Sequence, residues 1–551
     1  MEDIKNAEVE IPNLLRKINE PRVLEHNTLV EIERFFDSNL DYNQKEAAIK
    51  TMSLASGSEI LLIQGPPCTG KTTTIVEIVK QLLYRHRHWK ILIASQSNQA
   101  VDNVLEKIYQ TGSEEKILRI GNEEKMSDIA KQFTPDKVLD TLIKDNRNRI
   151  KENTIMDKNL QIQTELQALQ KDFYKSLQNI TSKLSQDKGS KEYNLATLFI
   201  KNIRLVFGTL LGISSWQNFR DIAFDIVIVD EAGRATLSEL LVPCVKARKI
   251  VFVGDHKQLA PVIDDEIIKN LNSFTKQEVT ISFFERLFEK LEKSNKDGIQ
   301  HLEHFKHRLI YNYRTEDRIC QLYNQPFYGG ELQTAKAIEG KREHYLSIFD
   351  SSVVWFDTSK RNDREDEQKG TGKINRCNVL VIEYKLREIL QGIKEKNIKY
   401  SIGIITPYKA QVDLLEKMLG SIKKDFKEYY RHNLDSNQDK DLRNGFDIGT
   451  VDSFQGSDRD IIIYDCVRAS KSKNSFEDRN KRKGSKINFI ADEKRLNVSL
   501  SRAKKLLIIV GDIEFLYTAS VSEGENPFYK IIGYIQKNKE LYQIVNAEEV
   551  K

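Results

Sequence analysis

The sequence predicts an α/β protein with two parallel sheets, each covered by helices. Short apolar runs alternate with helical patterns, once in each half of the 551 residues. Each run holds a few aliphatic residues and ends at a polar residue or a glycine, which is typical of strands buried on both faces. In the first half the runs are EILLIQG, KILIAS, IRLVFGT, FDIVIVDEA and KIVFVGD. In the second half they are SSVVWFDT, SIGIITP, DIGTVDSFQG, DIIIYDCV and LLIIVGD.

The positions of these runs predict two domains and an insertion. We expect the first α/β domain to comprise residues 1–112 and 201–300, and the second to comprise residues 301–551. Segment 113–200 has few strand signals, and apolar residues recur at steps of three and four from Ile162 to Leu184. This spacing predicts a helical hairpin that projects from the first domain. A helical layer that covers the first domain is the alternative.

Composition indicates a globular chain rather than a membrane or secreted one. Lys+Arg 86 minus Asp+Glu 81 gives +5, which suits nucleic acid only through a local basic patch. No apolar run approaches the ~18 residues of a membrane span. Acids stand near the N-terminus, where a signal peptide has basic residues. The five cysteines form no CxxC pair. We therefore expect an intracellular, cytoplasmic setting, with nucleoid or nucleus as alternatives, and no structural zinc.

The loop GPPCTGKTTT lies between a predicted strand and a predicted helix, and fits the pattern G-x-x-x-x-G-K-[ST]. Its two glycines allow a tight turn whose N–H groups point at a triphosphate. The lysine can reach the β and γ phosphates, and the following threonine hydroxyl can hold Mg²⁺. The thiol in the loop has no chemical step to perform. We expect ATP to be bound by Gly65, Pro66, Pro67, Cys68, Thr69, Gly70, Lys71, Thr72 and Thr73.

Two further strand ends carry polar residues suited to phosphate chemistry. The run VIVDEAGRA places Asp230 and Glu231 at the carboxyl edge of the first sheet. Asp230 suits Mg²⁺, and Glu231 suits orientation and deprotonation of the attacking water. Gln258, in VGDHKQLAPV, could position that water or sense the γ-phosphate. A polar turn without a function is the alternative for Gln258.

The second half supplies arginines. Phosphoryl transfer builds negative charge on the transferred group, and an arginine aimed there accelerates hydrolysis. Arg314 in NYRTEDR and Arg502 in RLNVSLSRAKK are the candidates. Either arginine alone would more often be a surface salt-bridge residue. The basic stretch at 470–489, SKSKNSFEDRNKRKGSKINF, is either an edge that tracks phosphates or a solvated loop.

Taken in order, these blocks resemble a known family. From about Leu40 to Asp512 they run LDYNQ, GPPCTGKTTT, ASQSNQAVDNV, VFGTLLG, VDEAGRAT, VGDHKQLAPV, YNYRTEDRICQLYNQPFYGGEL, GIITPYKAQ, TVDSFQGSDRDIIIYDCVRAS and RLNVSLSRAKKLLIIVGD. The series is similar to superfamily 1 helicases, and more narrowly resembles their 5′-to-3′ branch, which includes Senataxin, the nonsense-mediated-decay helicase and the Dna-two-type helicases. The resemblance implies two RecA-like domains with the nucleotide between them.

The resemblance also implies roles for single residues. Gln44 would read the adenine edge, Tyr313 would stack on the base, and Arg314 and Arg502 would be the two arginine fingers. Asp458 stands where relatives have a glutamate near the nucleotide. Gln455 and Gly456 belong to a block that links nucleotide state to the strand. The residues that would contact nucleic acid are Ser97, Asn98, Thr209, Thr406, Pro407, Tyr408 and Thr450.

The sequence departs from the family at three points. Relatives often have glycine at Cys68 and glutamine at Arg234. Many also carry a small β-barrel before the adenine-reading glutamine, and only about forty residues precede Gln44. We expect an ATP-dependent translocase on single-stranded DNA or RNA that moves 5′ to 3′ and unwinds duplexes. A protein partner could supply a strand-separating element or a nuclease. An ATP-gated clamp or switch subunit that does not unwind is the alternative.

Overall fold

The computed structural model describes residues 30–54, 60–112, 115–138, 140–141, 202–215, 222–263, 281–296, 305–433, 445–454, 456–470, 487–522 and 524–549. The chain forms two compact units. The first comprises Met1–Gln64, Lys71–Gly254 and Pro261–Arg308, and the second comprises Gly65–Gly70, Asp255–Ala260 and Leu309–Lys551. Of the segment 113–200, in which a helical hairpin was expected, the structure describes only 115–138 and 140–141.

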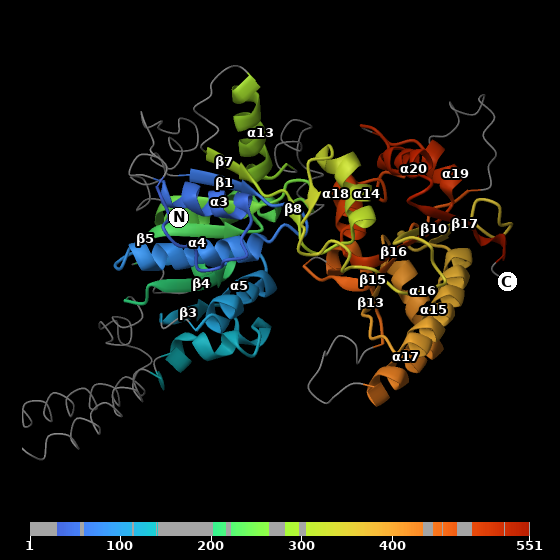
Figure 1. Cartoon of the computed structure of the whole chain (residues 1–551), viewed down its shortest axis with the longest axis horizontal. Helices are drawn as coiled ribbons and strands as arrows, with labels where there is room; N and C mark the ends of the chain where they lie inside the picture. Colours follow the sequence, from blue (N-terminus) through green and yellow to red (C-terminus); the bar gives the residue numbers. More distant parts are fainter. Residues whose placement is uncertain are drawn as a thin grey trace, which may run out of the picture. The chain divides into compact units, whose positions relative to one another are not determined.

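A seven-stranded parallel sheet forms the centre of the first unit (Figure 1), in the order β3-β4-β2-β5-β6-β1-β7. The strands are β1 Ile60–Gln64, β2 Ile91–Ser95, β3 Ile117–Ile120, β4 Leu205–Thr209, β5 Phe224–Asp230, β6 Ala247–Gly254 and β7 Lys306–Arg308. β1 and β2 are buried along their whole length, because helices cover both faces of the sheet.

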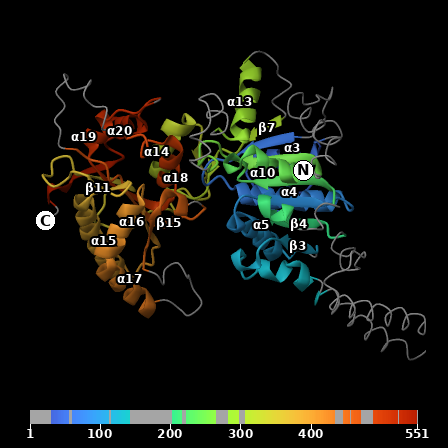
Figure 2. The same cartoon turned by 180° about the vertical axis from the view of Figure 1, so that it is seen from behind.

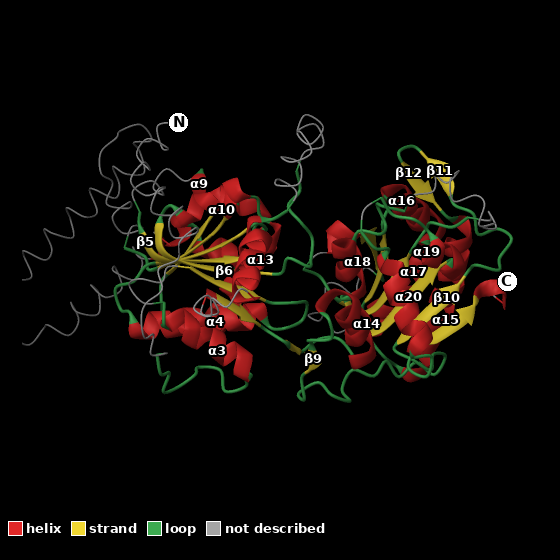
Figure 3. Ribbon diagram, turned by 90° about the horizontal axis from the view of Figure 1, so that it is seen from above, coloured by secondary structure: helices red, strands yellow, loops and turns green. Residues whose placement is uncertain are grey.

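Helices cover the two faces of this sheet separately. α3 and α4 lie on one face, and α9, α10 and α13 lie on the other (Figure 3). The second group packs Leu210, Leu240 and Phe284 against aliphatic residues of the strands. The helices of this unit are α3 Tyr42–Met52, α4 Lys71–Arg85, α5 Asn98–Gln110, α9 Leu210–Ser214, α10 Leu237–Cys244 and α13 Phe283–Lys296.

Two strands of this sheet differ from the sequence expectation. β3 lies inside the segment expected to be helical and pairs with β4. It has four residues, including an arginine, so no apolar run marks it. β7 has three polar or charged residues and pairs with β1. Both strands are too short for a periodic pattern to show.

The second unit contains a six-stranded parallel sheet in the order β14-β13-β15-β16-β10-β17. With the first sheet, it confirms the predicted α/β class with two parallel sheets. Its strands are β10 Val353–Asp357, β13 Ile402–Thr406, β14 Asp447–Thr450, β15 Arg459–Asp465, β16 Ala503–Gly511 and β17 Gln543–Asn546.

Two helical layers enclose this second sheet. α15, α16 and α17 lie side by side in both views (Figures 1 and 2) and contribute to one apolar core, whereas α14, α18, α19 and α20 contribute to another. The helices are α14 Asp317–Tyr328, α15 Arg376–Lys396, α16 Lys409–Met418, α17 Gly420–Asn433, α18 Glu493–Leu500, α19 Ile513–Thr518 and α20 Pro527–Lys537.

Two small pairs of strands complete the second unit. β8 Tyr311–Asn312 pairs in parallel with β9 Gln333–Thr334. β11 Glu367–Lys369 and β12 Gly372–Ile374 form an antiparallel hairpin that the sequence did not predict. Among the helices that the structure describes, none has the length and apolar character needed to cross a membrane.

Candidate nucleotide and nucleic-acid sites

The phosphate loop connects β1 to α4, as the sequence predicts. Cys68 and Gly70 both have positive φ, 69° and 79° respectively. The Thr69 hydroxyl donates to the Pro66 carbonyl at 2.9 Å. The loop from Gly65 to Thr69 is buried, whereas Gly70 and the first residues of α4, Lys71, Thr72 and Thr73, are partly exposed. The N-terminal turn of α4 therefore leaves polar groups where a phosphate can reach them.

Asp230 is the last residue of β5, and Glu231 follows it in a left-handed conformation with φ of 54°. A residue other than glycine is uncommon in the left-handed region. This conformation turns the chain sharply, so the Glu231 side chain points in a different direction than it would if the strand continued. The Glu231 N–H donates to Asp230 Oδ1 at 2.9 Å. Gly254 permits this turn, because a Cβ there would lie 2.7 Å from the Gly233 nitrogen.

Electrostatics set the Asp230 carboxyl apart from ordinary aspartates. Burial, followed by the neighbouring Glu231 carboxylate, raises the pKa of Asp230 to about 7, while Lys71 acts in the opposite direction. Lys71 and Asp230 therefore lie close enough to interact within the first unit. A buried carboxyl that needs a nearby cation to ionise is suited to a site that binds metal and phosphate.

Gln258 and Arg502 come together in the second unit. Arg502 Nη2 donates to Gln258 Oε1 at 3.3 Å, and Gln258 Nε2 donates to Asp255 Oδ2 at 2.8 Å. The Tyr328 hydroxyl also donates to Asp255 Oδ2, at 2.6 Å, and accepts from Asn497 Nδ2 at 2.7 Å. Tyr328 and Asn497 were missed by the sequence analysis, which assigned roles only to Gln258 and Arg502 at one end of this network.

Arg314 lies in the second unit among residues of three separate segments. Its Nε lies 3.4 Å from Asp458 Oδ2, and Lys504 Nζ lies 2.9 Å from the same oxygen. Burial alone would raise the pKa of Asp458, but Arg314 and Lys504 outweigh it and hold that pKa below its usual range. The Cys68 side chain interacts with the Arg314 guanidinium, and the Cys68 carbonyl accepts from the Tyr313 N–H at 2.8 Å.

Gln44 has a structural contact that the sequence did not reveal. Its side-chain oxygen accepts from the Asp41 N–H at 3.2 Å, and the Asp41 carboxylate accepts from the Gln44 N–H at 2.8 Å. This capping box begins α3. The bond occupies the amide oxygen of Gln44 and fixes the orientation of its side chain.

Three candidate strand-binding residues lie at the carboxyl edge of the first sheet. Ser97 caps α5 by accepting from the Ala100 N–H, and Thr209 caps α9 by accepting from the Gly212 N–H. β2 and β4 are neighbours, with Ser95 opposite Thr209. Asn98 accepts from Arg119 Nη2 at 2.9 Å, so the structure brings Asn98 together with a buried arginine that sequence reasoning did not select.

The other strand candidates lie at the carboxyl edge of the second sheet. Thr406 ends β13 opposite Thr450 of β14. Thr406 is fully buried, and its hydroxyl has no hydrogen-bond partner among the described residues. Pro407 is also buried, while Tyr408 is partly exposed at the N-cap of α16. Gly456 has φ of 77°, and Gln455 lies outside the described residues.

Comparison with known proteins agrees with this geometry. Two family models, each described as an AAA domain, match residues 39–266 and 280–514. DNA polymerase alpha-associated DNA helicase A of Saccharomyces cerevisiae is 28% identical over 530 residues, which cover 91% of this chain. The Regulator of nonsense transcripts 1 homolog of Drosophila melanogaster is 29% identical over 482 residues, or 85% of the chain. The chain belongs to the superfamily 1 helicases.

The alignments of this superfamily 1 helicase cover different fractions of the lengths of its relatives. It spans 69% of the yeast helicase A, 43% of the putative helicase mov-10-B.2 of Danio rerio and 34% of the Drosophila relative. Among solved structures, the arterivirus nonstructural protein 10 helicase in complex with DNA aligns with 84% of this chain and 62% of that chain. The sequence identity is 12% and the TM-score is 0.35.

Proposed function

We propose that this chain is an ATP-driven motor that moves 5′ to 3′ along single-stranded DNA or RNA and unwinds duplexes. The observation that carries the proposal is the arrangement at the carboxyl edge of the first sheet. A phosphate-loop lysine acts electrostatically on a buried aspartate, and a glutamate in a left-handed turn follows that aspartate. This combination suits hydrolysis of a nucleoside triphosphate.

In the hydrolytic step, Lys71 would bind the β and γ phosphate oxygens through its ammonium group. Glu231 would hold and deprotonate the attacking water, which its partly exposed position after β5 supports. Gln44 and Tyr313 would bind the adenine. Arg314 and Arg502 would stabilise the charge that builds on the transferred phosphoryl group, and Asp458 would hold Arg314 in position.

A magnesium ion fits the donor set of the first unit. Thr72 offers a hydroxyl in the first turn of α4, and Asp230 offers a carboxyl whose pKa is raised by burial and by Glu231, so a bound cation would favour its ionised form. Hard oxygen donors are those that Mg²⁺ prefers in sites that bind nucleotide phosphates. When bound, the ion would neutralise charge on the β and γ phosphates.

Residues at the carboxyl edges of the two sheets would bind the strand. Small polar residues and helix N-termini favour contacts with phosphates and sugars over base readout. Ser97, Asn98 and Thr209 would serve on the first sheet. Pro407, Tyr408 and Thr450 would contact the strand on the second sheet. Thr406 is buried, so it would help to position these residues. A protein partner could supply a further strand-separating element or a nuclease.

Steady-state ATPase rates with and without single-stranded DNA and RNA test the first half of the proposal. Unwinding of 5′-tailed and 3′-tailed duplexes tests the second. We expect strand-stimulated hydrolysis, and unwinding only of the 5′-tailed duplex. Lys71→Ala should abolish both activities. The exposed Lys125, on the same unit, provides the control, and Lys125→Ala should behave as the wild type.

If the chain is a clamp or switch subunit, the same assays should give a different result. A switch subunit would show ATPase stimulated by the strand, with neither unwinding nor displacement of a protein bound to the strand. Preferential unwinding of the 3′-tailed duplex would overturn the proposed polarity and leave the motor function intact.

A further inference from the structure

A cavity of about 870 Å³ opens in the second unit, beside the β11–β12 hairpin. Its wall is made by residues Gln368 to Lys373 of the hairpin, by the start of α16, and by Arg468 and Phe489. This volume lies within the range of small-ligand sites. Among the wall residues, Pro407 and Tyr408 were sequence candidates for strand binding, and Asn488 and Phe489 end the basic stretch at 470–489; the others were not singled out.

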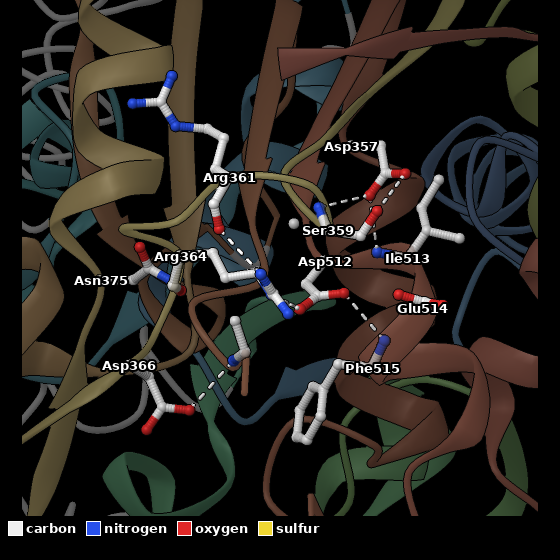
Figure 4. A network of polar contacts seen from close by, with 12 residues as sticks. Asp357, Ser359, Arg361, Arg364, Asp366, Asn375, Asp512, Ile513, Glu514 and Phe515 are labelled. Carbon is white, nitrogen blue, oxygen red and sulfur yellow. Dashed lines mark hydrogen bonds and ion pairs between the residues drawn. The ribbon is translucent and has the colours of Figure 1, made fainter. Parts of the chain in front are cut away.

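The base of the hairpin is fixed by a buried carboxylate. Asp366 accepts from Arg468 Nε at 2.9 Å and from the Ala469 N–H at 3.1 Å. Its other oxygen lies 2.8 Å from Lys373 Nζ. On the strand side, Arg364 Nε donates to Asp512 at 3.1 Å (Figure 4). The hairpin is thus joined by ion pairs to the segment that follows β15.

That segment is held in a strained conformation. Val467 has φ of 63°, which is a genuine outlier for a β-branched residue. The Val467 N–H donates to Asp465 Oδ1 at 3.0 Å, and the Val467 carbonyl accepts from Asn375 Nδ2 at 2.8 Å. The strain is maintained by buried polar partners, and it directs the next residue, Arg468, to the cavity wall.

An aromatic pair forms another part of the cavity wall. The rings of Tyr408 and Phe489 are stacked, with centroids 5.2 Å apart and an angle of 26° between their planes. Arg495 lies 4.5 Å from the Phe489 ring centre, and Arg468 interacts with Tyr408. Phe489 is 47% exposed. A large aromatic surface supported by arginines is therefore accessible from solvent.

The charge of the wall favours an anionic ligand. Lys369, at the tip of the hairpin, is exposed and has no carboxylate partner among the described residues. The exposed Lys409 lies 3.1 Å from Asp413, a pair that is worth little in water. Glycine at 370 and 372 keeps the hairpin thin, and a Cβ at Gly372 would lie 3.3 Å from Ala410.

We propose that this cavity receives a nucleobase of single-stranded nucleic acid, which packs against the Tyr408–Phe489 pair while Lys369 contacts an adjacent phosphate. The inference rests on the proposed function. It adds to that function a binding site for one base of the strand, in the cavity beside the β11–β12 hairpin. Stacking on an aromatic side chain strengthens binding by roughly tenfold or more per base and tolerates any sequence. An acidic peptide would use the lysines but would gain little from the rings.

Binding of a strand with and without its bases tests the proposal. The probes are a fluorescent oligothymidylate of about 15 nucleotides and an abasic strand of the same length. Affinities are measured by anisotropy with the full chain. We expect the wild type to bind the abasic strand roughly tenfold more weakly. Phe489→Ala should bind both strands with the same, weaker affinity. Tyr529→Ala is the matched control, because Tyr529 is also 47% exposed and belongs to another aromatic pair.

A second variant tests the phosphate contact independently of the rings. Lys369→Gln should lower the slope of log affinity against log salt by about 0.7, the value for one phosphate contact on a single strand. Equal wild-type affinity for intact and abasic strands would overturn the cavity as a base site, and would fit a site for an acidic peptide. No binding of either strand by the wild type would overturn the proposed function as well.

Discussion

Arg119 Nη2 donates to the side-chain oxygen of Asn98 at 2.9 Å, and Arg119 Nε donates to Asp102 at 2.7 Å. Arg119 is fully buried in β3, and Asp102 is 4% exposed. A buried arginine thus fixes the position of a residue proposed to bind the strand. Its cost in desolvation is offset by Asp102 and by the Ile120 carbonyl, which also accepts from the guanidinium.

We predict that Arg119→Met destabilises the first unit by about 3–5 kcal/mol, because Asp102 is left as a buried charge without its partner. The double variant Arg119→Met/Asp102→Leu should recover most of that loss. The free energies of unfolding of both variants are measured by denaturant titration, with fluorescence as the signal. Lys131→Met, which removes an exposed ion pair with Asp128, is the control and should change stability by less than about 1 kcal/mol. A double variant as unstable as the single would contradict this account.

Motifs that are continuous in sequence could be predicted, because strand, loop and helix follow one another within a few residues. The phosphate loop and the Asp230–Glu231 pair are of this kind. Tyr328 and Asn497 could not be predicted, since their hydrogen bond joins residues 169 positions apart. Phe489 was noted only as the end of the basic stretch at 470–489, because its stacking on the distant Tyr408 leaves no local pattern in the sequence. The strands β3 and β7 were also missed, because four and three residues are too few to show a periodic pattern.

The Glu231 carboxylate should be needed for hydrolysis and not for binding. We predict that Glu231→Gln lowers the ATPase rate by about 10²–10⁴, the usual contribution of a general base. ATP affinity and strand affinity should stay close to wild type, because the amide keeps the shape of the left-handed turn. Single-turnover hydrolysis and equilibrium binding separate these effects. Glu124→Gln, at an exposed carboxylate of the same unit, is the control. Near-normal turnover in Glu231→Gln would refute the assigned role.

Cys68 occupies a conformation that suits glycine, the residue often found there in relatives. Its φ of 69° costs an L-residue about 1–2 kcal/mol relative to glycine. We predict that Cys68→Gly keeps full ATPase activity and resists thiol reagents. Cys68 is 8% exposed, more than any of the other four cysteines, so alkylation should reach it first. Cys68→Ala keeps the backbone strain and serves as the comparison. A large loss of activity in Cys68→Gly would show that the thiol has a role.

Asp465 makes the stability of the second unit depend on pH. Burial raises the pKa of Asp465 to about 6, although Asn378, Gln411 and the Val467 N–H act in the opposite direction. Because the folded pKa is above the unfolded value of about 4, the folded chain binds more protons between these two pH values. Stability from this group therefore falls as pH rises through that window, by up to about 1.4 kcal/mol per pH unit.

Asp465→Asn removes this titration and keeps one acceptor for the surrounding amides. We predict that the wild type loses stability relative to Asp465→Asn as pH rises from about 4 to about 6, and that the difference is constant above that range. Thermal unfolding of both chains across this window measures it. Asp413→Asn, at an exposed carboxylate on α16, should show no such trend. Parallel pH profiles for Asp465→Asn and the wild type would mean that Asp465 ionises normally, and that its three hydrogen bonds outweigh the cost of burial.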